Sequence, residues 1–354
     1  MLASLLRRLA GDNSSRSSGL AGLKHSWIGR NQVVRRTLDS SPTLTHLLED
    51  GYRLFLARIS GPEAEADAAD LTARLQNVRQ RLQPRDFNCD EQPIILLAAG
   101  WRSGSTLLQR VLTSDPNTMI WGEPFAKSGI TTTLASQLSA FTAEWPPLDY
   151  FVANQGDDLS AAWIANSYPD PAQLIAAHRA FFIELLANPA KGLGRSRWGF
   201  KEVRLGGAHA LYLKLLFPKA RFVFLVRDPF AAFASFRHYI KSDFHAWPER
   251  PIRWAGEFGR LWRELALDLE RVAPEVDALW LRYEDYLTDP ALHEKLCLHV
   301  DADLRPPSEL SLIPSAGQVG ATQTAKPENR LLWYERRALK RALGDAGARL
   351  GYVH

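Results

Sequence analysis

Residues 94–112, IILLAAGWRSGSTLLQRVL, combine an apolar run, a turn of small and hydroxyl residues and a helix-like end. A turn of this kind directs backbone N–H groups at one point, and the start of a helix adds partial positive charge there. Gly104 lets the backbone approach an anion, while Ser105 and Thr106 offer hydroxyl hydrogen bonds and can cap the helix. Arg102 adds a planar fork of donors that suits phosphate or sulfate oxygens. The pattern predicts an anion-binding loop, although an ordinary tight turn that opens a helix has the same composition.

The loop differs from that of nucleoside triphosphatases, which requires GxxxxGK[ST] with a lysine on the outer phosphates. Here Gly104 is followed by serine. A metal-holding aspartate is also expected at the end of a second apolar strand. Asp228 does end a strand, but Pro229 follows it and favours a helix start. A P-loop kinase or triphosphatase is therefore the weaker alternative.

A second anion motif is predicted at residues 221–235, RFVFLVRDPFAAFAS. The strand ends at Arg227, and Pro229 occupies a favoured first helical position. Ser235 follows Arg227 by eight residues, about two helical turns into this helix. Arg227 and Ser235 can therefore meet at one anion beside the sheet, with Asp228 as a helix cap.

The elements that position these motifs alternate between strand and helix from residue 91 onward. Continuous apolar strands have both faces covered, and strand–helix alternation implies a parallel sheet. The predicted fold class is α/β, with a parallel central sheet flanked by helices. The strands expected are IILLAAG, RWGFKEV, RFVFLVR and ALWLRY.

Upstream of the sheet, residues 1–42 carry seven basic and two acidic side chains. Two amphipathic helices are expected next, one through residues 44–55 and one through residues 71–82. We therefore divide the chain into an N-terminal basic arm with a helical extension, 1–90, and a main domain, 91–354.

Composition excludes several classes of protein. The net charge of +4 is too small for a nucleic-acid coat, and no apolar run approaches the ~20 residues of a membrane helix. Cys89 and Cys297 are far apart, which predicts no disulfide framework and a reducing cytoplasm.

The two anion motifs together resemble those of sulfotransferases over roughly residues 91–300. GWRSGSTLL is similar to their 5′-phosphosulfate loop, and FVFLVRDPFAAFAS is similar to their 3′-phosphate motif. The resemblance implies the sulfotransferase variety of the P-loop fold and the donor 3′-phosphoadenosine 5′-phosphosulfate (PAPS), with no metal required. It assigns the 5′-phosphosulfate to Arg102, Ser103, Gly104, Ser105 and Thr106, and the 3′-phosphate to Arg227 and Ser235.

Arginine in place of lysine in the loop departs from the cytosolic small-molecule sulfotransferases. It is similar instead to carbohydrate, tyrosylprotein and several bacterial members. The resemblance therefore favours a carbohydrate or glycoconjugate acceptor over a peptide tyrosine, a lipid or a metabolite.

The catalytic base implied by the resemblance is Glu123, in DPNTMIWGEPF, which aligns with the glutamate of the tyrosylprotein branch. A histidine base of the small-molecule type is unavailable, since no histidine lies between His46 and His178. A loop carboxylate that pairs with an arginine is the blander interpretation of Glu123. The rival bases are His209, His238 and His245.

Further site residues follow from the same resemblance. Lys201, in RWGFKEVR, is expected to neutralise the transferring group, with Arg204 as a second candidate. Tyr283 is expected to contact the nucleotide, as is Lys326 in a covering segment, QVGATQTAKPENR. Surface charge and sheet-edge packing are the alternatives for these residues.

Residues 130–190 and 240–256 are expected to cap the mouth of the sheet. Their aromatic side chains can stack on sugars, although any hydrophobic lid has the same composition. The function predicted is transfer of a sulfuryl group from PAPS to an acceptor hydroxyl. A non-catalytic nucleotide-binding protein on the same scaffold is the other alternative. The sequence does not indicate an oligomeric state. The aromatic residues of the expected cap are Trp145, Tyr150, Trp163, Tyr168, Phe244 and Trp247.

Overall fold

The computed structural model describes most of the main domain and the helix before it. Several predicted residues lie outside the described part: Lys326, His238, His245, Phe244, Trp247 and the whole N-terminal arm. The described residues are 65–83, 86, 88–124, 129–156, 158–161, 163–237, 252, 254–310 and 331–352.

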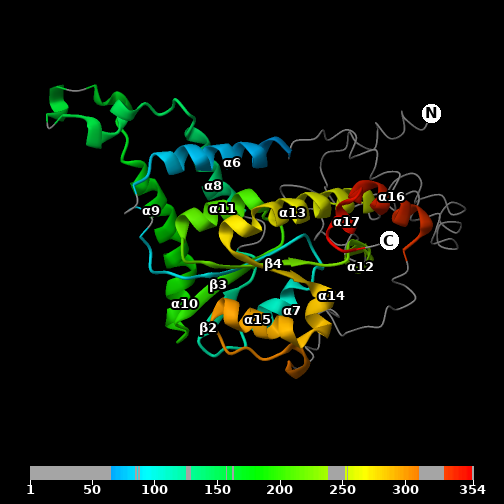
Figure 1. The fold of residues 1–354 in the computed structure, drawn as a ribbon. Coiled ribbons are helices and arrows are strands. Elements are labelled where there is room, and N and C mark those ends of the chain that lie inside the picture. The colour runs from blue at the N-terminus through cyan, green and yellow to red at the C-terminus, as the bar shows by residue number, and fades with distance from the viewer. Residues whose placement is uncertain are drawn as a thin grey trace, which may run out of the picture.

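A parallel five-stranded sheet forms the centre of the described structure, in the order β2-β3-β1-β4-β5 (Figure 1). This confirms the predicted α/β class. The edge strand β2 was not predicted, because four residues bounded by a turn carry little periodic signal. The strands are β1 (Ile94–Ala98), β2 (Thr118–Trp121), β3 (Arg197–Glu202), β4 (Arg221–Val226) and β5 (Ala278–Arg282).

Both faces of the sheet are covered, as the apolar strands predict. Side chains of successive strand residues point to opposite faces. All five residues of β1 are buried: Leu96 packs into a core cluster on one face, and Leu97 packs into a second cluster on the other. No β1 side chain therefore reaches water, and functional groups must come from the ends of the strands.

The helices divide between these two faces (Figure 1). The long helix α13 (Ala255–Val276) contributes Trp262 to the first cluster and Val272 to the second. The first cluster receives α7 (Ser105–Leu112), α12 (Pro229–Phe236), α14 (Tyr283–Thr288), α15 (Pro290–Val300), α16 (Trp333–Leu343) and α17 (Ala346–Arg349). The second receives α6 (Glu65–Gln80), α8 (Ile130–Ser136), α9 (Pro171–Phe182), α10 (Asn188–Gly192) and α11 (Gly207–Leu216).

Three of the described helices begin at an Asp-Pro pair, which explains where the preceding strand or loop ends. The proline occupies the first turn, and the aspartate accepts backbone N–H bonds that the helix leaves unpaired. Asp228 accepts from the N–H groups of Phe230 and Ala231, at 2.7 and 2.9 Å. The predicted start of α12 at Pro229 is thereby confirmed. Asp170 and Asp289 cap α9 and α15 in the same way.

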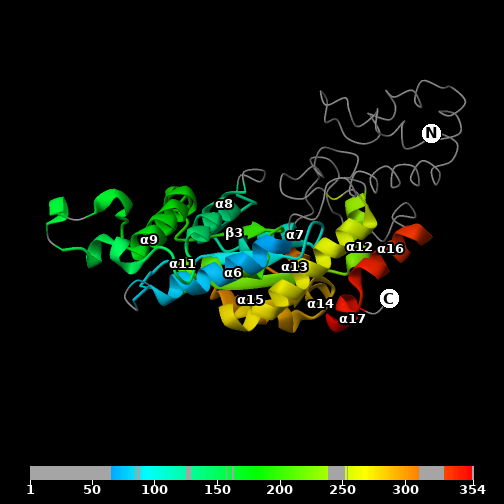
Figure 2. The same cartoon turned by 90° about the horizontal axis from the view of Figure 1, so that it is seen from above.

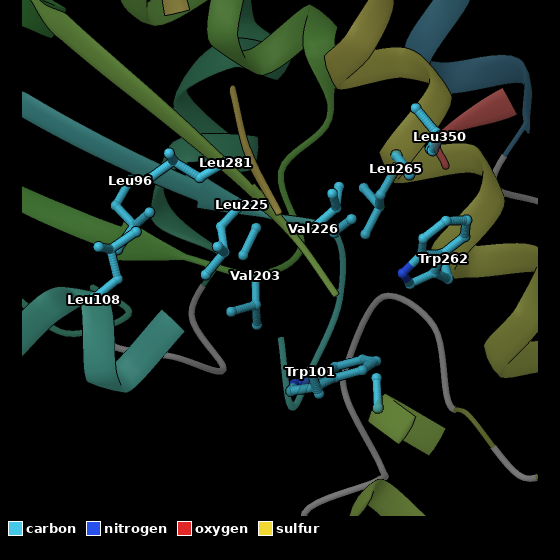
Figure 3. Close-up of a cluster of buried hydrophobic side chains, with 14 of the residues drawn as sticks. Leu96, Trp101, Leu108, Val203, Leu225, Val226, Trp262, Leu265, Leu281 and Leu350 are labelled. Carbon is cyan, nitrogen blue, oxygen red and sulfur yellow. The ribbon is translucent and has the colours of Figure 1, made fainter. Parts of the chain in front are cut away.

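The first core cluster reaches the predicted anion loop. Leu96, Leu225 and Leu281 from three strands meet Leu108 of α7, and Trp101 lies in the same cluster (Figure 3). Trp101 is 6% exposed and stacks on a phenylalanine of α12, with 5.6 Å between ring centroids. The loop is thus anchored by an indole buried in the core.

Short helical turns make up the segment between α8 and α9, which projects from the body (Figures 1 and 2). Arg81, beside the end of α6, donates hydrogen bonds to the carbonyl oxygens of Thr142, Trp145 and Pro146. This attachment holds the segment near the chain that leads into β1. The turns are η3 (Gln137–Ala140), η4 (Leu148–Tyr150), η5 (Val152–Asn154), η6 (Leu159–Ala161) and η7 (Ile164–Asn166); elsewhere lie η8 (Ile183–Ala187) and η11 (Pro307–Glu309).

The projecting segment carries the aromatic residues that were expected to cap the mouth of the sheet. Both views place it at the end of the molecule opposite α12 and α16. The prediction of a cap is therefore wrong for residues 141–170. The segment that contains Trp145, Tyr150, Trp163 and Tyr168 projects on the side away from α12, the helix that follows β4.

The second predicted N-terminal helix is present as α6, which packs Leu75 and Val78 into the second core cluster. The domain boundary at residue 90 stays a prediction. None of the described helices has the length and apolar character needed to cross a bilayer.

His209 generates a pH dependence of stability. It lies on α11, its Nε2 atom is buried, and burial lowers its pKa to about 4 from an ordinary 6.5, although Asp268 opposes this shift. Between pH 4 and 6.5, His209 is therefore protonated in the unfolded chain and neutral in the folded chain. The free energy of unfolding should fall by about 3 kcal/mol from this source as the pH drops from 6.5 to 4.

Urea unfolding of the parent and of His209→Leu between pH 4 and 7 measures this effect. The variant should lose stability less steeply on acidification. Equal slopes for the two proteins over this window would show that His209 is not the source.

Candidate active site

The candidate site lies along the carboxyl edge of the sheet. Because the five strands are parallel, the residue that follows each strand reaches the same edge. β1 is followed by α7 on one face, and its neighbour β3 is followed by α11 on the other, so the connections diverge between these two strands, which is where parallel α/β sheets bind ligands. In sheet order from β2 to β5, the candidate residues are Glu123, Lys201 with Arg204, the loop with Arg102, Arg227, and Tyr283.

The anion loop has an unusual backbone. Gly100, Arg102 and Gly104 all have positive φ angles, of 85°, 62° and 89°. Alternation of left-handed residues with ordinary ones turns successive N–H groups toward a common concavity, which favours an anion. A left-handed arginine is costly, and such strain is concentrated at functional sites. Gly100 N–H also bonds to the carbonyl oxygen of Val203 at 3.2 Å, which ties the loop to the chain leaving β3.

The start of α7 is open to a ligand. Gly104 is the N-cap and no side chain caps the helix, so the predicted capping by Ser105 and Thr106 is wrong. Both residues lie inside the first turn. The Ser103 hydroxyl is buried, 1% exposed, and has no hydrogen-bond partner among the described residues. A buried hydroxyl without a partner is costly, and an anion at the loop would satisfy it.

The second anion motif touches the first. Arg102 Nε donates to Ser235 Oγ at 2.8 Å, and Arg227 Nη1 donates to the Arg102 carbonyl oxygen at 2.9 Å. The Arg227 Nε atom is buried without a partner among the described residues, which leaves a donor for a ligand. The two motifs, 125 residues apart in the chain, therefore form one basic surface.

Tyr283 closes this surface on the β5 side. The Arg227 guanidinium lies over its ring, 4.7 Å from the centroid, in the geometry of a cation–π interaction. The ring also lies against the backbone of Gly104, where a Cβ atom would stand 2.1 Å from a ring carbon. This contact explains why position 104 requires a glycine. The contact of Tyr283 with the nucleotide stays a prediction.

Glu123 lies on the β2 side in a compact ionic cluster. Its Oε1 atom is 2.6 Å from Lys201 Nζ, and its Oε2 atom is 3.4 Å from an Arg204 nitrogen. The side chains of Lys201, Arg204 and Glu123 are only 8%, 11% and 17% exposed. The structure therefore brings together the three residues that the sequence assigned to proton transfer and charge neutralisation.

Glu202 belongs to the same cluster and was missed in the sequence. Its carboxylate receives two bonds from Arg204, at 2.9 and 2.5 Å. Burial raises the pKa of Glu202, the paired Arg204 opposes that rise, and the nearby Glu123 adds to it. Glu202 and Arg204 are two residues apart in the sequence K-E-V-R, but the sequence does not show that they pair. In the structure the chain turns at the end of β3, and Arg204 folds back onto Glu202. The sequence made both Lys201 and Arg204 candidates for charge neutralisation. The structure distinguishes them, because of the two only Arg204 is paired with Glu202.

The rival base His209 lies on α11, where its Nε2 atom is buried without a partner among the described residues. Of the predicted contacts, Lys326 lies outside the described residues. The described residues that come together are a loop with left-handed residues, a second basic motif and a carboxylate paired with an ammonium group. Such a set can bind a ligand with two anionic groups and accept a proton beside it.

Gly104 offers a test of the loop geometry, with Gly100 as a matched control. Both have positive φ, but a Cβ at Gly100 meets no atom within 4 Å. Gly100→Ala should cost about 1–2 kcal/mol of unfolding free energy from backbone strain alone. Gly104→Ala should cost more, because the Tyr283 ring must also move. Urea unfolding measures both, and equal costs would contradict the contact.

Comparison with solved structures finds sulfotransferases of low sequence identity. The sulfotransferase domain of the Synechococcus PCC 7002 olefin synthase is 19% identical, with 62% of this chain and 78% of that chain covered and a TM-score of 0.35. The enzyme from Alicyclobacillus acidocaldarius is 15% identical, with 73% and 94% covered and a TM-score of 0.39. Mouse sulfotransferase SULT7A1, complexed with PAP, is 12% identical, with 78% and 89% covered and a TM-score of 0.37.

No curated protein matches the chain. The pattern described as "Sulfotransferase family" matches residues 93–307, which is more than half of the chain and contains every element of the candidate site described above. The chain belongs to the sulfotransferase family.

Proposed function

We propose that this protein transfers a sulfuryl group from PAPS to the hydroxyl group of an acceptor. The observation that carries the proposal is the joined pair of anion motifs, linked by the Arg102–Ser235 bond, with the Glu123–Lys201 pair on the neighbouring side of the loop. A nucleotide with phosphates at both the 3′ and 5′ positions requires two such anion sites. A kinase donor requires only one.

The donor would be held by residues from three strand ends. The loop from Arg102 to Thr106 is assigned to the 5′-phosphosulfate, since its N–H groups and the buried Ser103 hydroxyl face a site that favours an anion. Arg227 and Ser235 are assigned to the 3′-phosphate, and the Tyr283 ring is placed to contact the nucleotide.

The transfer step is assigned to Glu123 and Lys201. Glu123 takes the proton of the acceptor hydroxyl while the hydroxyl oxygen of the acceptor attacks sulfur. The bond between sulfur and the 5′-phosphate oxygen breaks at the same time. Charge then gathers on the departing phosphate, where Lys201 and the loop N–H groups stabilise it. Lys201 now pairs with Glu123 at 2.6 Å. An anionic donor gives the ammonium group a second partner, which releases the carboxylate for the acceptor.

A carbohydrate or glycoconjugate is the proposed acceptor, on the strength of the arginine in the loop. The aromatic residues of the projecting segment give no support, because they lie away from the site. A peptide tyrosine, a lipid or a metabolite would be served by the same chemistry. The proposed setting is the cytoplasm, where free thiols such as Cys89 stay reduced.

Donor binding is tested by calorimetric titration with 3′-phosphoadenosine 5′-phosphate (PAP), 5′-AMP and ATP–Mg²⁺. PAP should bind best, and Arg227→Ala should weaken PAP by about 10- to 100-fold, because a charge-assisted contact is lost. Lys219→Ala is the control, since it removes the same charge from the opposite edge of the sheet. Tighter binding of ATP–Mg²⁺ would favour a kinase.

The base is tested by turnover of PAPS to PAP, first with water and then with a panel of carbohydrate, phenolic and lipid hydroxyls. Glu123→Gln should lower turnover by about 10²- to 10⁴-fold while PAP binding persists. Glu91→Gln, a carboxylate change at the amino edge of the sheet, should leave turnover unchanged. If the parent binds PAP but transfers to no acceptor, the non-catalytic alternative is favoured.

A further inference from the structure

The arginine beside the proposed base is held in a fixed direction. Glu202 receives Arg204 through two bonds, Nε to Oε1 at 2.9 Å and a terminal nitrogen to Oε2 at 2.5 Å. This bidentate arrangement fixes the plane of the guanidinium. Glu202 is itself fixed, because its Oε1 atom also accepts the Val203 N–H bond at 2.8 Å and its side chain is buried.

The same arginine nitrogen that binds Glu202 also faces Glu123, 3.4 Å from Oε2. Lys201 takes the other oxygen of Glu123. Each oxygen of the proposed base therefore has its own cation. Lys201 has a flexible stem and can move to another anion, whereas Arg204 is clamped. When Lys201 moves, Arg204 is the group that still orients Glu123.

Charge balance gives Glu202 a second effect. The cluster contains two carboxylates and two cations, and Arg204 lies between the carboxylates. In a buried cluster, an uncompensated guanidinium would strongly favour the ionised form of Glu123 and so weaken it as a proton acceptor. Glu202 offsets the charge of Arg204 without removing its hydrogen-bond direction.

We propose that Glu202 is a positioning residue for the transfer reaction: it holds Arg204 against Glu123 and offsets the arginine charge there. The inference rests on the proposed function, in which Glu123 is the base. Glu202 orients Glu123 through Arg204 and does not touch the reactants. Glu202 thereby gives the two cations of the cluster different roles. Lys201 is free to bind the donor, whereas Arg204 is held by Glu202.

The experiment compares the full-length parent with Glu202→Gln and Arg204→Met, each labelled with ¹³C at the glutamate carboxyl carbon. The resonance of Glu123 is identified as the one that disappears in Glu123→Gln, and it is followed by NMR as a function of pH. Glu91→Gln is the control, since it removes a carboxylate paired with Lys191 at the opposite edge of the sheet. PAP titration checks that each variant is folded.

The two variants should move the titration midpoint of the Glu123 resonance in opposite directions. In Glu202→Gln the arginine charge is no longer offset, so the midpoint moves to lower pH. In Arg204→Met a cation is lost, so the midpoint moves to higher pH. Turnover of PAPS with water should fall in both variants, and Glu91→Gln should change neither measurement. A merely structural role would lower turnover without opposite shifts.

Unmoved midpoints, or shifts in the same direction, would overturn the role of Glu202 while leaving the proposed function intact. If Arg204→Met fails to fold, the direction of the shift in Glu202→Gln still decides. If Glu202→Gln fails to fold, Glu202→Asp takes its place: it keeps the charge but shortens the side chain that holds Arg204, and an unchanged turnover would overturn the role. Failure of the proposed function has a different signature. In that case Glu123→Gln keeps the turnover of the parent, whatever the two variants do to the titration.

Discussion

Burial of β1 on both faces limits where this fold can place polar and charged groups. Leu96 and Leu97 enter opposite core clusters, and no side chain of this strand reaches water. A parallel sheet covered in this way offers chemistry only at its ends, where backbone N–H groups and helix termini remain unpaired. The left-handed loop after β1 lies at such an end, and the buried indole of Trp101 anchors it to the core.

The strand order places two groups of polar residues on opposite sides of the loop that follows β1. On the β4 and β5 side, Arg227 and Tyr283 join the loop in a surface suited to anions and a flat ring. On the β3 and β2 side, Lys201 and Glu123 form a tight ion pair. Because β1 lies between β3 and β4, its loop borders both groups. A donor held by the loop would therefore have its binding groups on one side and its reactive groups on the other.

The charges around Lys201 and Glu123 balance one another, which is evident only when the whole cluster is considered. The buried Glu202, the partly buried Glu123 and two cations are assembled at the ends of neighbouring strands, and burial alone would raise the pKa of Glu202. Partial neutralisation by Arg204 makes such a buried charge tolerable. The projecting aromatic segment lies at the end of the molecule opposite α12, so acceptor recognition by those aromatic rings has no structural support.

The local features of this protein can be predicted from its residues. The α/β class, the start of α12 at Asp228–Pro229 and both anion motifs follow from periodicity, capping chemistry and fixed spacing, which act over a few residues. How distant segments meet is visible only in the folded chain. The contact of Arg102 with Ser235, the turn of Arg204 onto Glu202 and the attachment of the aromatic segment by Arg81 depend on strand order and on side-chain directions. Residue types do not encode these directions locally, because packing of the whole sheet selects them.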